Sequence, residues 1–396
     1  MANIQPTVDP RQSSPSRQLS ERFSLARLWA IVIKEFIQLR RDRLTFAMMV
    51  GIPIMQLTLF GFAINGDPKH LPTVIVAHEQ GTLTRTLVAA LENSRYFSII
   101  NTTDNDAWAD EALADGDAQF SLTIPSDFER KLVRGERPAL LLEADATDPS
   151  ATGNALAAVQ QLANTALTHD LEGPLRSLNA GAPPFEVRIQ RRYNPEGITQ
   201  YNIVPGLMGV ILTMTMIMMT ALGVTREVER GTMENLLATP IRPLEVMIGK
   251  ISPYILIGYV QVTVILLAAH GIFHVPFVGS LPVLLGCILL FILANLSVGI
   301  TISSAARNQT QAMQMTFFFF LPSMLLTGFM FPFRGMPHWA QNIGEALPLT
   351  HFLRLIRGVM LKGNSFPELW PNLWPLLLFM GVMLFIGLRR FRRTLD

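Results

Sequence analysis

The 396-residue sequence has little cysteine and little charge. Its single cysteine, Cys287, excludes an intramolecular disulfide and a cysteine-based metal site. Charged residues make up 16% of the chain, against about 25% in typical soluble domains. No Asp, Glu, Lys or Arg occurs in the 56 residues from 251 to 306. The uneven charge excludes an ordinary cytosolic protein, and the apolar content of 49% excludes a disordered one.

Six apolar stretches are predicted to cross a bilayer as helices, which takes about 20 residues each. They are residues 44–64, 203–224, 251–273, 283–304, 314–331 and 369–388. The alternative is a set of buried helices in a soluble core, but such helices rarely stay uncharged for so long. Residues 1–43 contain no apolar signal-peptide region, so we expect the first stretch to remain as an anchor.

Lysine and arginine beside the predicted spans indicate the orientation of the chain. Basic residues gather in the N-terminal segment 1–43, in the loop 226–250 and in the tail 389–396. The positive-inside rule therefore predicts that both termini and this loop are cytoplasmic. The segment 332–363 must then lie outside, although it also contains four basic residues. These are Arg334, Arg354, Arg357 and Lys362.

Residues 65–202 are too long for a loop and are predicted to form an extracytoplasmic α/β domain inserted between the first two spans. Alternating patterns predict strands at 72–77, 97–101, 118–124, 139–144 and 185–192, and helices at 82–93, 107–113, 126–134 and 150–178. Ser126 is the expected N-cap of the third helix. The domain contains 19 acidic and 11 basic residues, which indicates either a solvated surface or attraction to cations.

Two segments beside the spans are predicted to form amphipathic helices. Residues 20–41 place Leu, Trp and Phe at three- and four-residue spacing with basic residues elsewhere, which is typical of a helix lying in the membrane plane. The alternative is a helix of a soluble domain. Residues 332–363 predict two short outer helices, broken at Pro337 and Pro348.

The loop 226–250 between the second and third predicted spans contains a helix of its own. Gly231 ends the continuation of the second span, Thr232 can cap the loop helix, and Pro240 ends it. Pro243 then starts the helix that becomes the third span. On physical grounds alone, the loop is either a simple turn or a docking element for a cytoplasmic partner.

Residues 229–250 read ERGTMENLLATPIRPLEVMIGK. This segment resembles the corresponding loop of ABC-2 type permeases, the membrane subunits of a class of ATP-binding-cassette exporters. The layout of one span, a large outer domain and five further spans is similar to the drug-exporter-like branch. The resemblance implies that the loop is a coupling helix that docks on an ATPase subunit. Its ATPase-coupling residues are then Glu229, Arg230, Gly231, Thr232, Glu234, Leu236 and Pro240.

The resemblance also implies partners, location and cargo. A separate ATP-binding-cassette ATPase subunit carries ATP and Mg, and a second permease copy completes a homodimer or heterodimer. A periplasmic adaptor (membrane fusion) protein is a further partner to test. The expected location is the bacterial inner membrane. The expected cargo is a drug-like, lipid or other amphiphilic molecule, moved out of the cytoplasm or the inner leaflet.

The chain itself lacks the groups that power transport. A P-loop, G-x-x-x-x-G-K-[ST], is absent, and no acidic residue lies within a predicted span, which disfavours a proton relay. We therefore expect no catalytic, cofactor-binding or metal site in this chain and no nucleic-acid partner. Two other classes stay open: a secondary transporter, and a membrane-anchored sensor or assembly factor whose outer domain binds a partner.

Four residues are candidates for a substrate cavity within the spans: Met214, Met218, Asn295 and Gln314. Methionines of the second span can form a pliable apolar surface, but they can equally face lipid. The polar side chains can contact substrate or form hydrogen bonds between helices.

Overall fold

The computed structural model of the protein describes residues 68–168, 170–171, 183–230 and 243–393. These residues belong to one unit by their contacts, residues 51–396. The predicted amphipathic helix 20–41, the first predicted span 44–64 and the helix inside the loop 226–250 lie outside the described residues.

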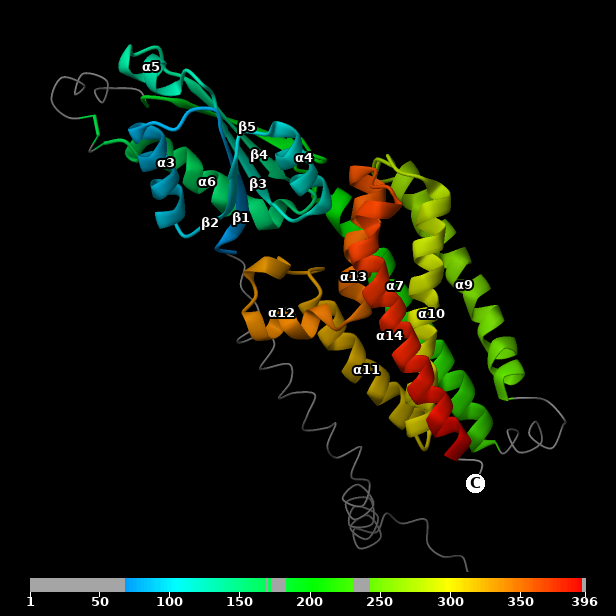
Figure 1. Ribbon diagram of the computed structural model, residues 1–396. Coiled ribbons are helices and arrows are strands. Elements are labelled where there is room, and N and C mark those ends of the chain that lie inside the picture. Colours follow the sequence, from blue (N-terminus) through cyan, green and yellow to red (C-terminus); the bar gives the residue numbers. More distant parts are fainter. Residues whose placement is uncertain (1–67, 169, 172–182, 231–242, 394–396) are drawn as a thin grey trace, which may run out of the picture. The chain divides into compact units, whose positions relative to one another are not determined.

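The described residues between 68 and 192 form a sheet domain around five strands (Figure 1). The strands are β1 (Leu71–Ala77), β2 (Phe97–Thr103), β3 (Phe120–Ile124), β4 (Ala139–Asp145) and β5 (Glu186–Arg192), in the order β2-β1-β3-β4-β5. β1 pairs in parallel with β2 and β3, β3 pairs antiparallel with β4, and β4 pairs in parallel with β5. The predicted α/β domain is therefore confirmed, with a mixed sheet.

Helices cover both faces of the sheet. They are α3 (Thr82–Asn93), α4 (Asp106–Asp115), α5 (Phe128–Val133) and α6 (Pro149–Thr165). Because successive side chains of a strand point to opposite faces, Ile75 of β1 packs with α3, α5 and α6, whereas Val74 packs with α4. All seven residues of β1 are buried, as expected for a central strand covered on both sides.

Two details of this domain differ from the sequence-based expectation. The third helix begins at Phe128 with Asp127 as its N-cap residue, so the prediction that Ser126 caps it is wrong. Phe128 is fully buried, and the helix starts where this ring enters the core. The helix expected over 150–178 is α6, which ends at Thr165.

In the described ranges 183–230 and 243–393, five long helices follow the sheet domain. They are α7 (Thr199–Glu229), α9 (Pro243–Gly271), α10 (Leu281–Ala305), α11 (Gln309–Leu326) and α14 (Phe366–Arg393). Among the described residues, four helical stretches are long and apolar enough to cross a membrane: Thr199–Glu229, Pro253–Gly271, Leu281–Ala305 and Phe366–Gly387. α11 occupies most of the predicted fifth span, but it begins five residues earlier, with Gln309 and Gln311, and does not belong to these four.

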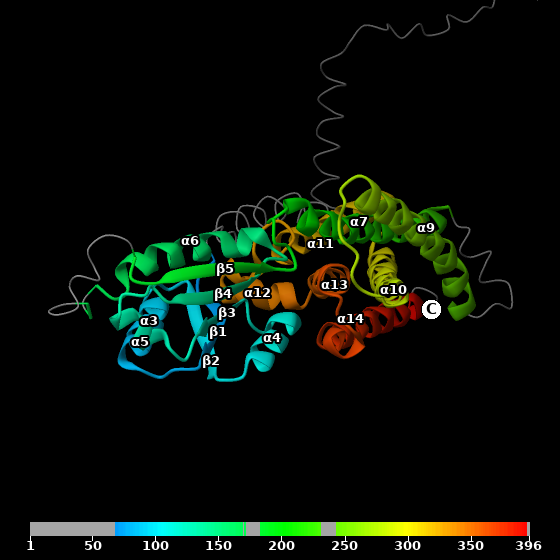
Figure 2. The same ribbon diagram turned by 90° about the horizontal axis from the view of Figure 1, so that it is seen from above.

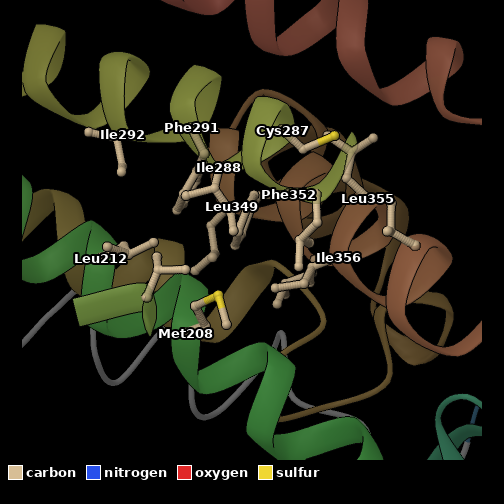
Figure 3. Packing of buried hydrophobic residues seen from close by; sticks show 14 of the residues in the cluster. Met208, Leu212, Cys287, Ile288, Phe291, Ile292, Leu349, Phe352, Leu355 and Ile356 are labelled. Carbon is tan, nitrogen blue, oxygen red and sulfur yellow. The ribbon is translucent and has the colours of Figure 1, made fainter. Parts of the chain in front are cut away.

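α10 is the central helix of this bundle and packs between α7 and α14 (Figure 2). Gly299 permits close approach to α7, because a Cβ at this position would lie 2.7 Å from the Cβ of Thr220. On α10, Phe291 stacks on Phe352 with a centroid distance of 3.9 Å (Figure 3). Leu212 of α7 belongs to the same buried cluster.

The segment between α11 and α14 contains short elements that we call the connector helices. They are η3 (Phe333–Gly335), α12 (His338–Glu345), α13 (Pro348–Arg357) and the π-helical turn η4 (Gly358–Lys362). The two short helices predicted here are confirmed, each starting at or directly after the predicted proline. The apolar face of α13 is buried, whereas Arg354 on its other face is exposed.

Short connections fix the sheet domain to the bundle. Only six residues, 193–198, separate β5 from α7. Asn194 is buried and closes this turn, because its side chain both accepts from the Ile198 N–H and donates to the Ile198 carbonyl, each at 2.9 Å. The Asn202 amide of α7 also donates to Asp148, the N-cap of α6, at 3.0 Å.

The connector helices contact the end of α4. The Lys362 ammonium lies 2.8 Å from the Asp145 carboxylate and donates to the carbonyls of Leu113 (2.9 Å) and Ala114 (3.2 Å). Arg334 donates to the Gly116 carbonyl at 2.7 Å. Cations at the C-terminus of a helix complement its dipole, so these contacts attach the sheet domain to the connector helices by charge as well as by hydrogen bonds.

Candidate functional site

The first residues of the loop 226–250 are described, and they are bonded to another helix. The backbone N–H of Gln309, the first residue of α11, donates to Glu229 Oε1 at 2.8 Å, and the Gln309 amide donates to Glu229 Oε2. Arg226 Nε donates to the Gln309 side-chain oxygen at 3.3 Å. A carboxylate at the start of α11 satisfies a free N–H and complements the helix dipole. The base of the loop is therefore bonded to α11.

The exposure of this end of α7 suits contact with another protein. Arg226, Glu229 and Arg230 are all exposed, and Arg230 is the C-cap residue of α7. α9 begins at Pro243, as predicted. The remaining predicted coupling residues lie outside the described part of the chain and stay predictions: Gly231, Thr232, Glu234, Leu236 and Pro240.

The predicted substrate-cavity residues lie in the bundle. Met214 and Met218 of α7 are half-buried, and Gln314 of α11 is also half-buried. Asn295 of α10 is fully buried, and its amide donates to the Phe291 carbonyl at 2.9 Å. The side-chain oxygens of Asn295 and Gln314 are buried and have no hydrogen-bond partner within the part of the chain that the structure describes.

Buried polar oxygens of this kind can receive a donor from a ligand or a water molecule. None of the four candidates lines the large cavity described below. Another polar residue of the spans, Gln261, links two helices, because it accepts a hydrogen bond from Thr215 at 3.0 Å. This contact is of the helix-bridging kind that polar groups in membranes often make.

Sequence reasoning missed Gln309 as the partner of Glu229. A signal was available, because Asn308 and Gln309 follow an apolar stretch and Asn308 is a good N-cap that accepts from the Gln311 N–H at 2.8 Å. The choice of Glu229 as the acceptor depends on how α7 and α11 pack, and the two residues are 80 positions apart.

Comparison with known proteins defines the class. The sequence model described as ABC-2 family transporter protein matches residues 43–389. The chain therefore belongs to the ABC-2 transporter family and is a transmembrane permease of the ABC-exporter type.

Three relatives from Escherichia coli K12 match nearly the whole chain. The chain is 28% identical to "Probable multidrug ABC transporter permease YbhR" over 93% of its own length and 98% of the relative. It is 29% identical to "Probable multidrug ABC transporter permease YbhS", covering 94% and 98% of the two chains. It is 28% identical to "Inner membrane transport permease YhhJ", also covering 94% and 98%. The predicted resemblance to ABC-2 permeases is thus confirmed.

Proposed function

We propose that the protein exports a drug-like, lipid or other amphiphilic molecule from the cytoplasm or the inner leaflet of the bacterial inner membrane. A separate ATP-binding-cassette ATPase subunit binds ATP with Mg and supplies the energy. The names of the relatives YbhR and YbhS, which describe multidrug transporter permeases, support this substrate class.

The ATPase docks on the loop 226–250 in this proposal. The observation that carries the proposal is the bonding of Glu229 and Arg226 to Gln309. A force applied to the loop acts directly on α7 and α9, which flank it, and through Gln309 it also acts on α11. Three helices of the bundle therefore move with the loop, and α10 follows because it packs against α7.

The assembly proposed here contains two permease chains, either identical or different, and two ATPase subunits. Both termini and the loop 226–250 face the cytoplasm, and the sheet domain lies outside the cell membrane, where a periplasmic adaptor is a candidate partner. The uncharged spans and the basic segments beside them support this topology.

Purification of the permease with its ATPase tests the docking. The variants Glu234→Arg and Leu236→Asp change the predicted docking helix, and Glu186→Arg, an exposed residue of β5, is the matched control. We expect the two loop variants to lose ATPase copurification and ATPase stimulation, whereas the control retains both.

Two results would contradict the proposal. If the loop variants stimulate the ATPase as the natural protein does, the loop is not the docking element. If purified permease moves cargo in vesicles without any ATPase, the protein is a secondary transporter.

A cysteine introduced at position 150 in a Cys287→Ser background tests the topology. We expect this cysteine to react from outside intact cells, and protection there would contradict the proposed topology.

A further inference from the structure

A cavity of about 740 Å³ lies between the connector helices, the start of α14 and the α4–β3 end of the sheet domain. This volume lies within the range of about 300–1,000 Å³ that is typical of small-molecule sites. The cavity is far from the loop 226–250 in the sequence, and those predicted coupling and substrate residues that the structure describes do not line it. Its lining combines cationic, anionic and aromatic side chains.

Most charges on the cavity wall already have partners. Lys362 pairs with Asp145, and Arg354 pairs with Glu345 through two hydrogen bonds. Asp148 caps α6, where it accepts the Ser150 N–H at 3.1 Å. Glu368 accepts the backbone N–H at the start of α14. These groups build the wall and are not available to a ligand without loss of an existing bond.

Two guanidinium groups on the wall have carbonyl groups as their hydrogen-bond acceptors in the described segments. Arg334 donates to Gly116, and Arg357 donates to the Gly328 carbonyl at 3.2 Å. Among the described residues, neither forms an ion pair with a carboxylate, and Arg357 Nε is buried without a hydrogen-bond partner. Desolvation by the surrounding chain lowers the pKa of both groups, yet a guanidinium stays protonated at neutral pH. Arg357 is therefore an incompletely satisfied cation, whereas Arg334 is an exposed cation without a carboxylate partner among the described residues.

Two carboxylates on the sheet-domain side of the cavity also lack a partner of opposite charge among the described residues. Asp115 and Asp117 line the cavity, and neither forms an ion pair with another described residue. Burial raises the pKa of Asp115, and the neighbouring carboxylates of Asp117, Glu368 and Glu111 raise it further. Negative charge is thus in excess here. Arg334 donates to the carbonyl of Gly116, which stands between Asp115 and Asp117 in the chain, and all three charged side chains line the same cavity, so one small ligand can reach both charges.

Aromatic side chains place the cavity at the level of lipid headgroups. Trp374 lines the cavity, and Trp370 and Trp374 of α14 are 49% and 50% exposed. Both lie near the start of the apolar stretch Phe366–Gly387, at the end opposite its arginine-rich terminus. Exposed tryptophans at the end of a span mark the membrane–water interface. Leu377 and Leu378 continue the exposed surface toward the bilayer interior, where acyl chains lie.

We infer that this cavity binds the headgroup of a zwitterionic amphiphile, with its phosphate or carboxylate on Arg334 and Arg357 and its ammonium group on Asp115 and Asp117. Arginine matches the geometry of a phosphate or carboxylate, and carboxylates match an ammonium group. A purely anionic ligand would meet two unpaired carboxylates, and a purely cationic ligand would meet two unpaired guanidiniums. The inference goes beyond transport, because binding at this cavity requires neither nucleotide nor ATPase.

Short-chain lipids test the inference with the purified full-length protein in detergent. The probes are the dihexanoyl forms of phosphatidylethanolamine, phosphatidylcholine and phosphatidylglycerol, which share chains and phosphate. The first carries a primary ammonium, the second a quaternary ammonium without N–H groups, and the third no ammonium. We expect phosphatidylethanolamine to bind roughly tenfold more tightly than the other two, because only it presents hydrogen-bonding N–H groups to the carboxylates. Equal affinity for the three probes would overturn the inference without any variant being made.

Paired substitutions test the two halves of the cavity separately. R334Q/R357Q is expected to weaken phosphatidylethanolamine binding roughly tenfold or more, and D115N/D117N to reduce it to the level of phosphatidylglycerol. E186Q/R188Q removes one charge of each sign from exposed positions of β5, outside the cavity, and is expected to change nothing. If either cavity variant binds phosphatidylethanolamine as the natural protein does, the inference is wrong.

Competition identifies the source of the ligand. Soluble glycerophosphoethanolamine carries the same headgroup without acyl chains. Displacement of the lipid probe by this compound supports a headgroup site that also admits soluble zwitterionic cargo. Failure to displace it, with the preference for phosphatidylethanolamine intact, supports a site for membrane lipid.

Discussion

Replacing Lys362 by Met is expected to detach the sheet domain from the connector helices. The side chains of Lys362 and Asp145 are each 9% exposed, and the ammonium also donates to two carbonyls at the end of α4. Removing one partner of a buried ion pair costs about 3–5 kcal/mol, because the other charge stays buried without compensation. At about 1.4 kcal/mol per factor of ten, local opening becomes roughly 150- to 5,000-fold more frequent.

Hydrogen–deuterium exchange of the intact protein measures this opening. We expect faster exchange in residues 113–119 and 358–364 of K362M, with little change in the core of α10. In the double variant K362M/D145N, the destabilisation should fall short of the sum of the two single effects by about 0.5–3 kcal/mol, because the two residues interact.

The matched control is Lys131→Met. Lys131 also forms a close ion pair, 2.7 Å from Asp127, but the two side chains are 43% and 25% exposed. Exposed pairs contribute little, so exchange should change less than about fivefold. Equal effects of K362M and K131M, or no effect of K362M on the two segments, would refute the reasoning that burial makes the Lys362 contact strong.

Three further predictions use other contacts. Glu229→Ala removes the acceptor for Gln309. ATPase stimulation should fall, although the protein remains as thermostable as the natural form. Unchanged stimulation would exclude this contact from coupling. Phe352→Ala removes a ring stacked on Phe291 and should lower the free energy of unfolding by about 3–5 kcal/mol, measured as a lower melting temperature. A shift no larger than that caused by Phe385→Ala at an exposed position would contradict this prediction. Asp115→Asn should stabilise the protein at neutral pH. Burial raises the pKa of Asp115 in the folded protein above 3.8, the ordinary value. The natural protein therefore loses stability as the pH rises from 3.8 through the folded-state pKa of this group. Melting temperatures of the two forms should converge in acid, and a gap that widens in acid would refute this sign.

The fold was predictable wherever one local pattern decided it. The helix expected over 82–93 coincides with α3, because Leu83, Leu87 and Leu91 repeat at helical spacing and all three are buried. Four of the predicted spans match apolar helices for the same reason, since long uncharged stretches have few alternatives. The N-cap prediction was wrong because Ser126 and Asp127 are adjacent and both belong to residue types that can cap a helix. The packing of Phe128 determines where the helix starts, and Asp127 is the residue before it.

The candidate site was predictable only in part. The loop 226–250 carries a local motif, so its position and its flanking helices could be read from neighbouring residues. The cavity lined by Arg334, Arg357 and Asp115 could not, because its walls come from segments more than 200 positions apart. The contacts of Arg334 and Lys362 with the sheet domain were likewise unpredictable, because a rule that counts local charge takes no account of partners distant in the sequence.

The turn closed by Asn194 connects the sheet domain directly to the first residues of α7, so a movement of α7 affects the position of that domain. A helix of 31 residues is about 46 Å long at 1.5 Å per residue. A tilt of about 5° moves one end of such a rod by about 4 Å relative to the other. Because Asn194 and Asn202 fasten β5 and α6 to the start of this rod, the strands must swing with it. If α7 tilts as one body, a displacement at Glu229 is accompanied by one at the turn that leads into the sheet domain.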